Sequence, residues 1–233
     1  MPPPVLPSVH LWHDQEFRGP AANMAIDEAL FDEALESQRP FLRFYSWNET
    51  AYTVGYFHDF EKDSLDDLDP PPVRRLTGGG LVEHGRDITF TLAIPGGLEV
   101  VQRTGPERYR AVHQCLVDAF EKVEVRLALE SDDPQAEARC FARPVRWDVI
   151  DPVSGEKVAG GAQRRTRGGI LHQGSVRPPP DHREVEAEWT YRFAYRLAFD
   201  VSPLFESDVF AIEDRADRLE REKYATAAWN RGG

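Results

Sequence analysis

The chain has 233 residues, of which 41% are hydrophobic and 29% charged, as is typical of a globular protein with a substantial core. Its net charge of −12 argues against sequence-independent binding to nucleic acid or anionic membranes. No stretch approaches the roughly 20 apolar residues of a membrane span, and the N-terminus lacks the basic and apolar segments of a signal peptide. With two cysteines, Cys115 and Cys140, we expect a cytoplasmic protein with reduced thiols.

Three segments have the residue pattern of helices. The first extends from Asn23 to about residue 35, with Asn23 as the expected N-cap. The second extends from about Pro106 to residue 122, because its apolar residues recur at helical spacing and a proline suits the first turn. The third is highly charged and covers roughly residues 212–229.

Strand patterns lie between these helices, and residues 152–156 have the composition of a hairpin turn. Helices grouped around hairpin-joined strands indicate an α+β fold and not a doubly wound parallel sheet. No proline-rich stretch is long enough to be a linker, so we expect one domain over residues 1–233. The expected strands cover residues 41–47, 52–54, 88–94, 123–129, 145–150, 157–160 and 169–176.

Three consecutive glycines follow a pair of arginines in the segment R-R-L-T-G-G-G, residues 74–80. Without Cβ atoms, residues 78–80 can approach a ligand closely, and their N–H groups can form an anion-binding concavity. The adjacent arginines add charge and forked donors. The pattern is neither a Walker A loop nor a dinucleotide-binding fingerprint, and a flexible glycine turn is the alternative.

A second segment, residues 155–169, interleaves small and basic residues as G-E-K-V-A-G-G-A-Q-R-R-T-R-G-G. The small residues leave room for a backbone and a ligand to approach each other, and Lys157 stands just before them. A basic hairpin with a solvated lysine is the alternative. A strand pattern with one histidine, His172, follows, and a lone histidine is more often structural than catalytic.

The chain resembles the catalytic domain of the biotin/lipoate protein ligase family, and in particular its lipoate ligase and octanoyltransferase branch. Three segments carry the resemblance, namely R-R-L-T-G-G-G-L-V-E-H (74–84), E-K-V-A-G-G-A-Q-R-R (156–165) and G-I-L-H-Q-G-S-V (169–176). N-M-A-I-D-E at residues 23–28 resembles the first helix of that branch. The resemblance implies a mixed, largely antiparallel central sheet flanked by helices, which agrees with the α+β pattern.

The resemblance also implies an acyl site. Lys157 would lie against the acyl carbonyl, where its cation could stabilise a developing oxyanion. His84 would line the pocket, Gly160 and His172 would shape it, and Lys157 or His172 could accept the proton of an attacking amine. No metal ligands are expected for the transferase. The residues expected to contact an acyl or acyl-adenylate group are Arg75, Thr77, Gly78, Gly79 and Gly80.

Two chemistries are known in this family, and both acylate a carrier lysine. Transferases take an octanoyl group from acyl carrier protein, usually through a cysteine thioester and without a cofactor, whereas ligases activate free lipoate with ATP and magnesium. The segment C-F-A-R-P-V-R-W-D, residues 140–148, resembles the C-F-x-x-P-x-x-x-[DE] stretch that holds the nucleophile of one octanoyltransferase group. Cys140 is therefore the predicted nucleophile, its thiol activated by neighbouring cations, and a buried core cysteine is the alternative.

Further features bear on this choice. The chain stops soon after Trp229, so the accessory domain that many ligases carry is expected to be missing or to be a separate protein, which favours the transferase. The triple glycine resembles the ligase loop, whereas residues 85–89 depart from the ligase pattern, so the ATP-dependent alternative stays open. In both cases the expected acceptors are lipoyl domains of 2-oxoacid dehydrogenase subunits or the glycine-cleavage carrier protein.

Carrier proteins of this kind are acidic, and an acidic chain repels them unless a basic patch meets them. The arginines expected to form this patch at the pocket mouth are Arg74, Arg75, Arg164, Arg165 and Arg167. A non-catalytic lipoyl- or biotin-binding protein on the same scaffold is a third hypothesis, which the presence of both Cys140 and Lys157 disfavours. Nucleic-acid binding is disfavoured because no aromatic and basic face is found.

Overall fold

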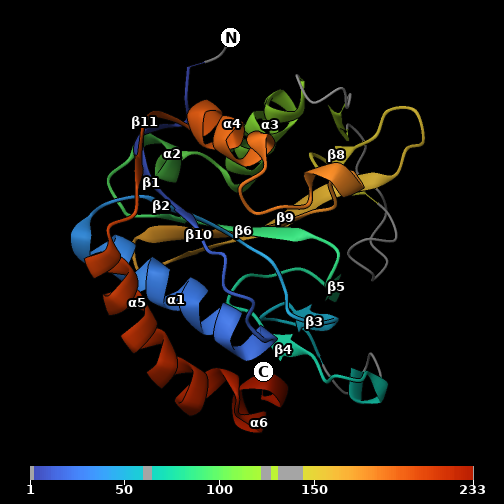
Figure 1. Ribbon diagram of the computed structural model, residues 1–233, viewed down its shortest axis with the longest axis vertical. Coiled ribbons are helices and arrows are strands. Elements are labelled where there is room, and N and C mark those ends of the chain that lie inside the picture. The colour runs from blue at the N-terminus through green and yellow to red at the C-terminus, as the bar shows by residue number, and fades with distance from the viewer. Residues whose placement is uncertain (1–2, 60–64, 122–126, 131–143, 233) are drawn as a thin grey trace.

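The computed structural model describes residues 3–59, 65–121, 127–130 and 144–232. Within these ranges, an eight-stranded sheet in the order β11-β1-β2-β6-β10-β9-β8-β7 forms the centre of the molecule (Figure 1). Its strands are β1 (Leu6–His13), β2 (Phe41–Tyr45), β6 (Ile88–Ile94), β7 (Ala128–Leu129), β8 (Val149–Ile150), β9 (Lys157–Thr166), β10 (Gly169–Val176) and β11 (Ala198–Pro203).

The large sheet is mixed and largely antiparallel. Strand β1 runs parallel to both β2 and β11, and every other neighbouring pair is antiparallel. Residues 152–154 form a turn between the antiparallel strands β8 and β9, as expected for a hairpin. The sheet and its flanking helices confirm the predicted α+β fold.

Helices cover both faces of this sheet (Figure 1). On one face, α1 (Pro20–Ser37) and α5 (Glu206–Leu219) pack against residues such as Phe41 and Leu171. On the other face, α3 (Gly105–Phe120) and α4 (Glu188–Leu197) bury Leu116 and Trp189 against the sheet, beside the short α2 (Glu99–Gln102). No helix in the described ranges has both the length and the apolar character needed to cross a membrane.

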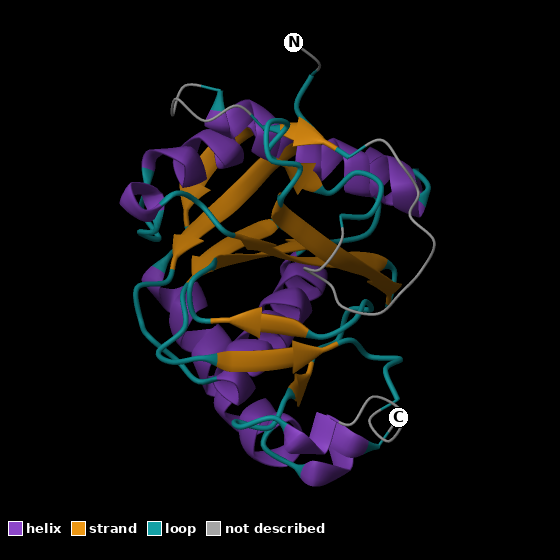
Figure 2. Cartoon of the chain, turned by 90° about the vertical axis from the view of Figure 1, so that its right-hand side faces the viewer, coloured by secondary structure: helices purple, strands orange, loops and turns teal. Residues whose placement is uncertain are grey.

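A second, three-stranded sheet lies on the α1 side of the large sheet (Figures 1 and 2). It consists of β3 (Ala51–Val54) between β4 (Val73–Arg74) and β5 (Val82–His84). The glycine-rich loop connects β4 to β5, so this small sheet holds both ends of the loop. The C-terminal helix α6 (Ala227–Arg231) packs against β4.

The helices begin and end differently from the sequence prediction at several points. Helix α3 agrees with it, and Thr104 and Glu107 form a capping box at its start. For α1 the predicted cap is wrong, because Gly19 is the N-cap and Asn23 lies buried inside the helix. The predicted third helix is also wrong in extent, since α5 begins at Glu206 and a π-helical turn separates it from α6.

A buried arginine holds α1 to the sheet. The Arg43 side chain on β2 is fully buried and contacts Asp14 Oδ2 at 2.6 Å and Asp27 Oδ1 at 2.9 Å. Its guanidinium also lies 3.9 Å from the centre of the Tyr45 ring, and it donates to Asn23 Oδ1 at 2.8 Å. A buried cation of this kind is tolerated because carboxylates, an amide and an aromatic face replace its hydration.

We expect Arg43→Met to lower the free energy of unfolding by about 3–5 kcal/mol, because it leaves Asp27 buried without its cation and leaves Asp14 with Arg18 as its remaining described cation. Urea denaturation followed by circular dichroism measures this loss. The matched control is Arg218→Met, which removes an exposed i,i+4 pair with Asp214 and is expected to cost less than about 1 kcal/mol. Equal stability of the two variants would contradict the proposed role of Arg43.

Candidate active site

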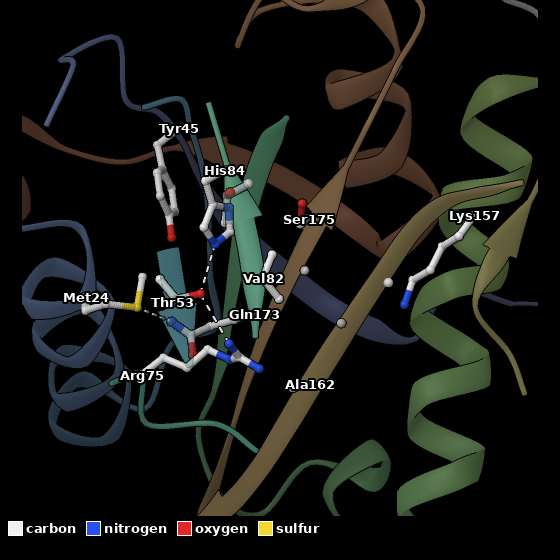
Figure 3. A pocket seen from close by; sticks show the side chains of 14 residues that line it. Met24, Tyr45, Thr53, Arg75, Val82, His84, Lys157, Ala162, Gln173 and Ser175 are labelled. Carbon is white, nitrogen blue, oxygen red and sulfur yellow. Dashed lines mark hydrogen bonds between the residues drawn. The ribbon is translucent and has the colours of Figure 1, made fainter. Parts of the chain in front are cut away.

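A cavity lies between the large sheet, the small sheet and α1 (Figure 3). Met24, Val82 and Ala162 contribute apolar surface to it, and the glycines of β9 and β10 leave space along one wall. Among the residues predicted for the acyl site, the ones that line this cavity are Arg75, His84, Lys157 and Gly160. Thr77, Gly78, Gly79, Gly80 and His172 are not among its lining residues, so their contact with a ligand stays a prediction.

Lys157 is a buried cation at one side of the cavity (Figure 3). Its Nζ lies 2.7 Å from Asp148 Oδ2, and the two side chains are 4% and 0% exposed. Tyr109 donates its hydroxyl to Asp148 Oδ1 at 2.6 Å and accepts the N–H of Gly161 at 2.9 Å. These contacts exclude the alternative of a solvated lysine and fix the ammonium beside the glycines of β9.

Residue 160 is a glycine because the Lys157 side chain occupies the space that a Cβ would need. A Cβ at residue 160 would lie 2.3 Å from Lys157 Cε and 2.4 Å from Nζ. The small residues of this motif therefore make room for the catalytic candidate itself and not for a ligand alone. Any side chain at this position would displace the ammonium.

His84 and Asp87 form a second polar group, next to the small sheet. His84 Nδ1 lies 2.8 Å from Asp87 Oδ2, and its Nε2 lies 2.9 Å from Thr53 Oγ1. Ser175 and Thr89 also donate hydroxyls to Asp87 Oδ2. Burial alone would raise the pKa of Asp87, but the attraction of His84 and these hydrogen bonds outweigh it and lower the pKa.

Arg75 organises the glycine loop from inside. Its guanidinium donates to Gly78 O at 2.7 Å, to Gly80 O at 2.9 Å and to Thr53 Oγ1 at 3.2 Å. The loop packs so closely on Gly55 that a Cβ there would lie 2.0 Å from Gly79 O. A glycine is needed at residue 79 as well, because its φ is +89°.

Gln173 connects α1 to this loop, a role that no sequence pattern predicted. Its Nε2 donates to Asp27 Oδ2 at 2.7 Å, and its Oε1 accepts the Thr77 hydroxyl at 2.7 Å. Thr77 is fully buried and contacts Gln173, which lines the cavity. The signal that could have identified Gln173 is its position next to His172 in the G-I-L-H-Q-G-S-V motif.

His172 lies on the other face of β10, beneath α3. Its ring stacks on Phe90 at 5.4 Å and lies 5.4 Å from the ring of His113. Burial lowers the pKa of His172 well below its ordinary value and that of His113 to about 4, so both imidazoles are neutral near pH 7. Its role as a proton acceptor stays a prediction.

The predicted arginine patch is mostly used for internal contacts. Arg74 is buried and donates to the carbonyls of Tyr56 and His58, so its assignment to the pocket mouth is wrong. Arg164 donates to Leu76 O, and Arg167 forms an ion pair with Asp32. Of the five arginines, Arg165 is exposed and has no carboxylate partner among the described residues.

The predictions for the two cysteines have different outcomes. Cys115 lies in the core as predicted, where burial raises the pKa of its thiol to about 12. Cys140 lies outside the described residues, so its role as the nucleophile stays a prediction. In the described ranges, no group of three or more His, Cys, Asp and Glu residues is placed to hold a metal ion.

The fold is that of a ligase-type catalytic domain, and the chain belongs to the family described as "Lipoyl protein ligase A/B catalytic domain", whose model matches residues 19–186. It is 31% identical over 213 residues to octanoyltransferase LipM of Bacillus cereus, covering 85% of this chain and 76% of that protein.

Among solved structures, the chain resembles the bi-partite lipoate protein ligase of Thermoplasma acidophilum, with a TM-score of 0.67 at 20% identity and 97% of each chain covered. It also resembles a lipoate-protein ligase A solved with bound ATP, with a TM-score of 0.71 at 19% identity, covering 97% of this chain and 99% of that one. At these identities the likeness shows the common fold.

We expect Asp87→Asn to lower the free energy of unfolding by about 1–3 kcal/mol near neutral pH, because a charged acceptor of several buried donors is lost. The folded-state pKa of Asp87 lies below 3.8, so the stabilisation is present above that pH and is lost as the pH falls through the folded-state value. Urea denaturation of both proteins over a pH series measures the difference. Asp214→Asn, at an exposed position, is the control, and a difference that persists at the lowest pH would contradict this assignment.

Proposed function

We propose that this protein is a cytoplasmic octanoyltransferase that moves an octanoyl group from a thioester donor to a lysine of a lipoyl domain. Two facts support the proposal. The curated relatives that cover most of the chain are octanoyltransferases of the LipM type. The observation that carries the chemistry is the Lys157 ammonium, held by Asp148 at the wall of a partly apolar cavity.

The site suits acyl transfer because it offers a fixed cation where negative charge develops. When a nucleophile attacks a thioester, the carbonyl oxygen becomes an oxyanion, and a preorganised cation stabilises it strongly in a site that excludes water. Asp148 and Tyr109 keep the ammonium in place before the substrate arrives. Met24, Val82 and Ala162 provide apolar surface for the hydrocarbon chain.

The proposed reaction has two steps. The Cys140 thiolate attacks the octanoyl thioester of acyl carrier protein, a new carbon–sulfur bond forms, and the donor thiolate leaves and takes up a proton. The neutral amine of the acceptor lysine then attacks the acyl-Cys140 thioester. The amide forms, the bond to Cys140 breaks, and the proton lost by the amine restores the Cys140 thiol. No cofactor enters either step.

The acceptors in this proposal are the lipoyl domains of 2-oxoacid dehydrogenase subunits or the glycine-cleavage carrier protein. The second candidate function is an ATP-dependent lipoate ligase, in which Lys157 would contact the acyl-adenylate and Cys140 would take no part. The fold likeness to an ATP-bound ligase is the observation that favours it. The two functions differ in the need for ATP and for Cys140.

Intact-mass analysis separates them. We expect the wild-type protein, incubated with octanoyl-acyl carrier protein and no ATP, to gain one octanoyl group that hydroxylamine removes, because a thioester is labile to this nucleophile. Cys140→Ala should gain none, and Cys115→Ala is the matched control that should still be acylated. Acylation of the lipoyl domain by Cys140→Ala, and only with lipoate, ATP and magnesium, would establish the ligase.

Gly160→Ala tests the position of Lys157. The added methyl group would lie where the Lys157 side chain now sits, so we expect the ammonium to move and the kcat for octanoyl transfer to fall about 10- to 100-fold. Gly19→Ala is the control, because a Cβ there meets no atom within 4 Å. Full activity of Gly160→Ala, at unchanged stability, would rule out a role for the precise position of the ammonium.

A further inference from the structure

The turn that presents Asp148 to Lys157 contains a strained residue. The N–H of Asp148 donates to Val145 O at 2.8 Å, and the N–H of Val145 donates to Asp148 Oδ2 at 2.8 Å, so residues 145–148 form a closed turn. Trp147, the third residue of this turn, has a φ of +72°, in the left-handed region that a residue with a large side chain rarely adopts. Such residues persist only where their surroundings fix them, and they cluster at functional sites.

Helix α3 supplies contacts that fix Trp147. His113 Nδ1 lies 2.8 Å from Trp147 O, and because a carbonyl oxygen can only accept, the imidazole donates from Nδ1. The Arg110 guanidinium lies 4.8 Å from the centre of the Trp147 ring. Tyr109, about one helical turn before His113, donates its hydroxyl to Asp148 Oδ1. One side of α3 therefore holds both the strained residue and the carboxylate that follows it.

The surroundings of His113 leave it one donor and no charge. The side chain is fully buried, and burial lowers the pKa of the imidazole to about 4, so the ring is neutral near pH 7. Its Nε2 is buried and has no hydrogen-bond partner among the described residues, which is costly for a polar atom. An apolar side chain would avoid this cost, so the contact from Nδ1 to Trp147 O explains why a histidine is present.

These contacts end at the Lys157 ammonium, which lies 2.7 Å from Asp148 Oδ2. Both oxygens of the Asp148 carboxylate accept hydrogen bonds, one from α3 and one from within the turn, so a shift of the turn would move the counter-charge of the lysine. We propose that His113 is a positioning residue, which holds the turn through Trp147 O and so places the Lys157 ammonium for acyl transfer. This inference rests on the proposed octanoyltransferase function and adds a residue to its site.

Two substitutions of His113 separate the roles of its ring nitrogens. The amide nitrogen of an asparagine takes the place of Nδ1, whereas that of a glutamine lies near the place of Nε2. We expect His113→Gln to lower the kcat for octanoyl transfer about 10- to 100-fold and to change KM less than about threefold, because the cation acts on the transition state. His113→Asn should keep a kcat close to that of the wild type, because it retains the donor to Trp147 O. His182→Gln makes the same change at a half-buried position that does not line the cavity, and it should leave kcat unchanged.

A folded His113→Gln protein with the kcat of the wild type would overturn the positioning role. An equal loss of kcat in both variants would also overturn it, because packing and not the Nδ1 donor would then be responsible. The wild-type protein provides a second measurement that needs no variant. Nitrogen NMR spectra of its histidine rings show which nitrogen carries the proton, and a proton on Nε2 of His113 in place of Nδ1 would rule out the contact with Trp147 O.

The proposed function can fail separately from this role. If the wild-type protein acylates the lipoyl domain only with lipoate, ATP and magnesium, the octanoyltransferase function is overturned, and the variants are compared in the ligase reaction with the same expected losses. If it catalyses neither reaction, crystal structures of the two variants decide. Movement of Asp148 and Lys157 in His113→Gln but not in His113→Asn would support the positioning role, and an unmoved pair in both would overturn it.

Discussion

The buried carboxylate of Asp27 joins the parts of the molecule that build the cavity between the two sheets. It accepts hydrogen bonds from Arg43 and Tyr45 on β2 and from Gln173 on β10. Gln173 in turn accepts the hydroxyl of Thr77, beside the glycine loop. Burial raises the pKa of Asp27, so the charged form depends on the cation and donors around it. The first helix, the central sheet and the loop are therefore placed relative to one another by the partners of a single charge.

The parts of the fold that depend on local pattern could be predicted from the sequence. The alternation of apolar residues with threonines at the start of residues 88–94 and the capping box of α3 are signals of this kind. Strands β1 and β11 were missed because they pair with each other in parallel from opposite ends of the chain, which leaves no hairpin turn in the sequence. Helix α4 was missed although Trp189, Phe193 and Leu197 recur at helical spacing, so its signal was present.

The site shows the same division between local motif and distant contact. Lys157 and Gly160 stand in one motif, and the resemblance to the family placed both at the acyl site. Gly160 is needed, however, because the Lys157 side chain folds back over it. This contact cannot be derived from the spacing of the two residues in the sequence. Asp148 and Tyr109 come from other segments, and only the tertiary structure brings them to the lysine. The sequence could thus predict that Lys157 lies at the cavity, but not which residues hold it there.

Net charge is a poor guide to how this protein meets an acidic carrier. Arg74 and Arg164 are bound to backbone carbonyls, and Arg167 is paired with Asp32, so most of the expected basic patch serves the fold. At physiological salt, exposed charges are screened beyond about 8 Å, so an approaching acidic surface responds to the charges nearest to it and much less to the total. How strongly an acidic partner is repelled therefore depends on the charges at the contact surface, and the net charge of −12 does not determine it.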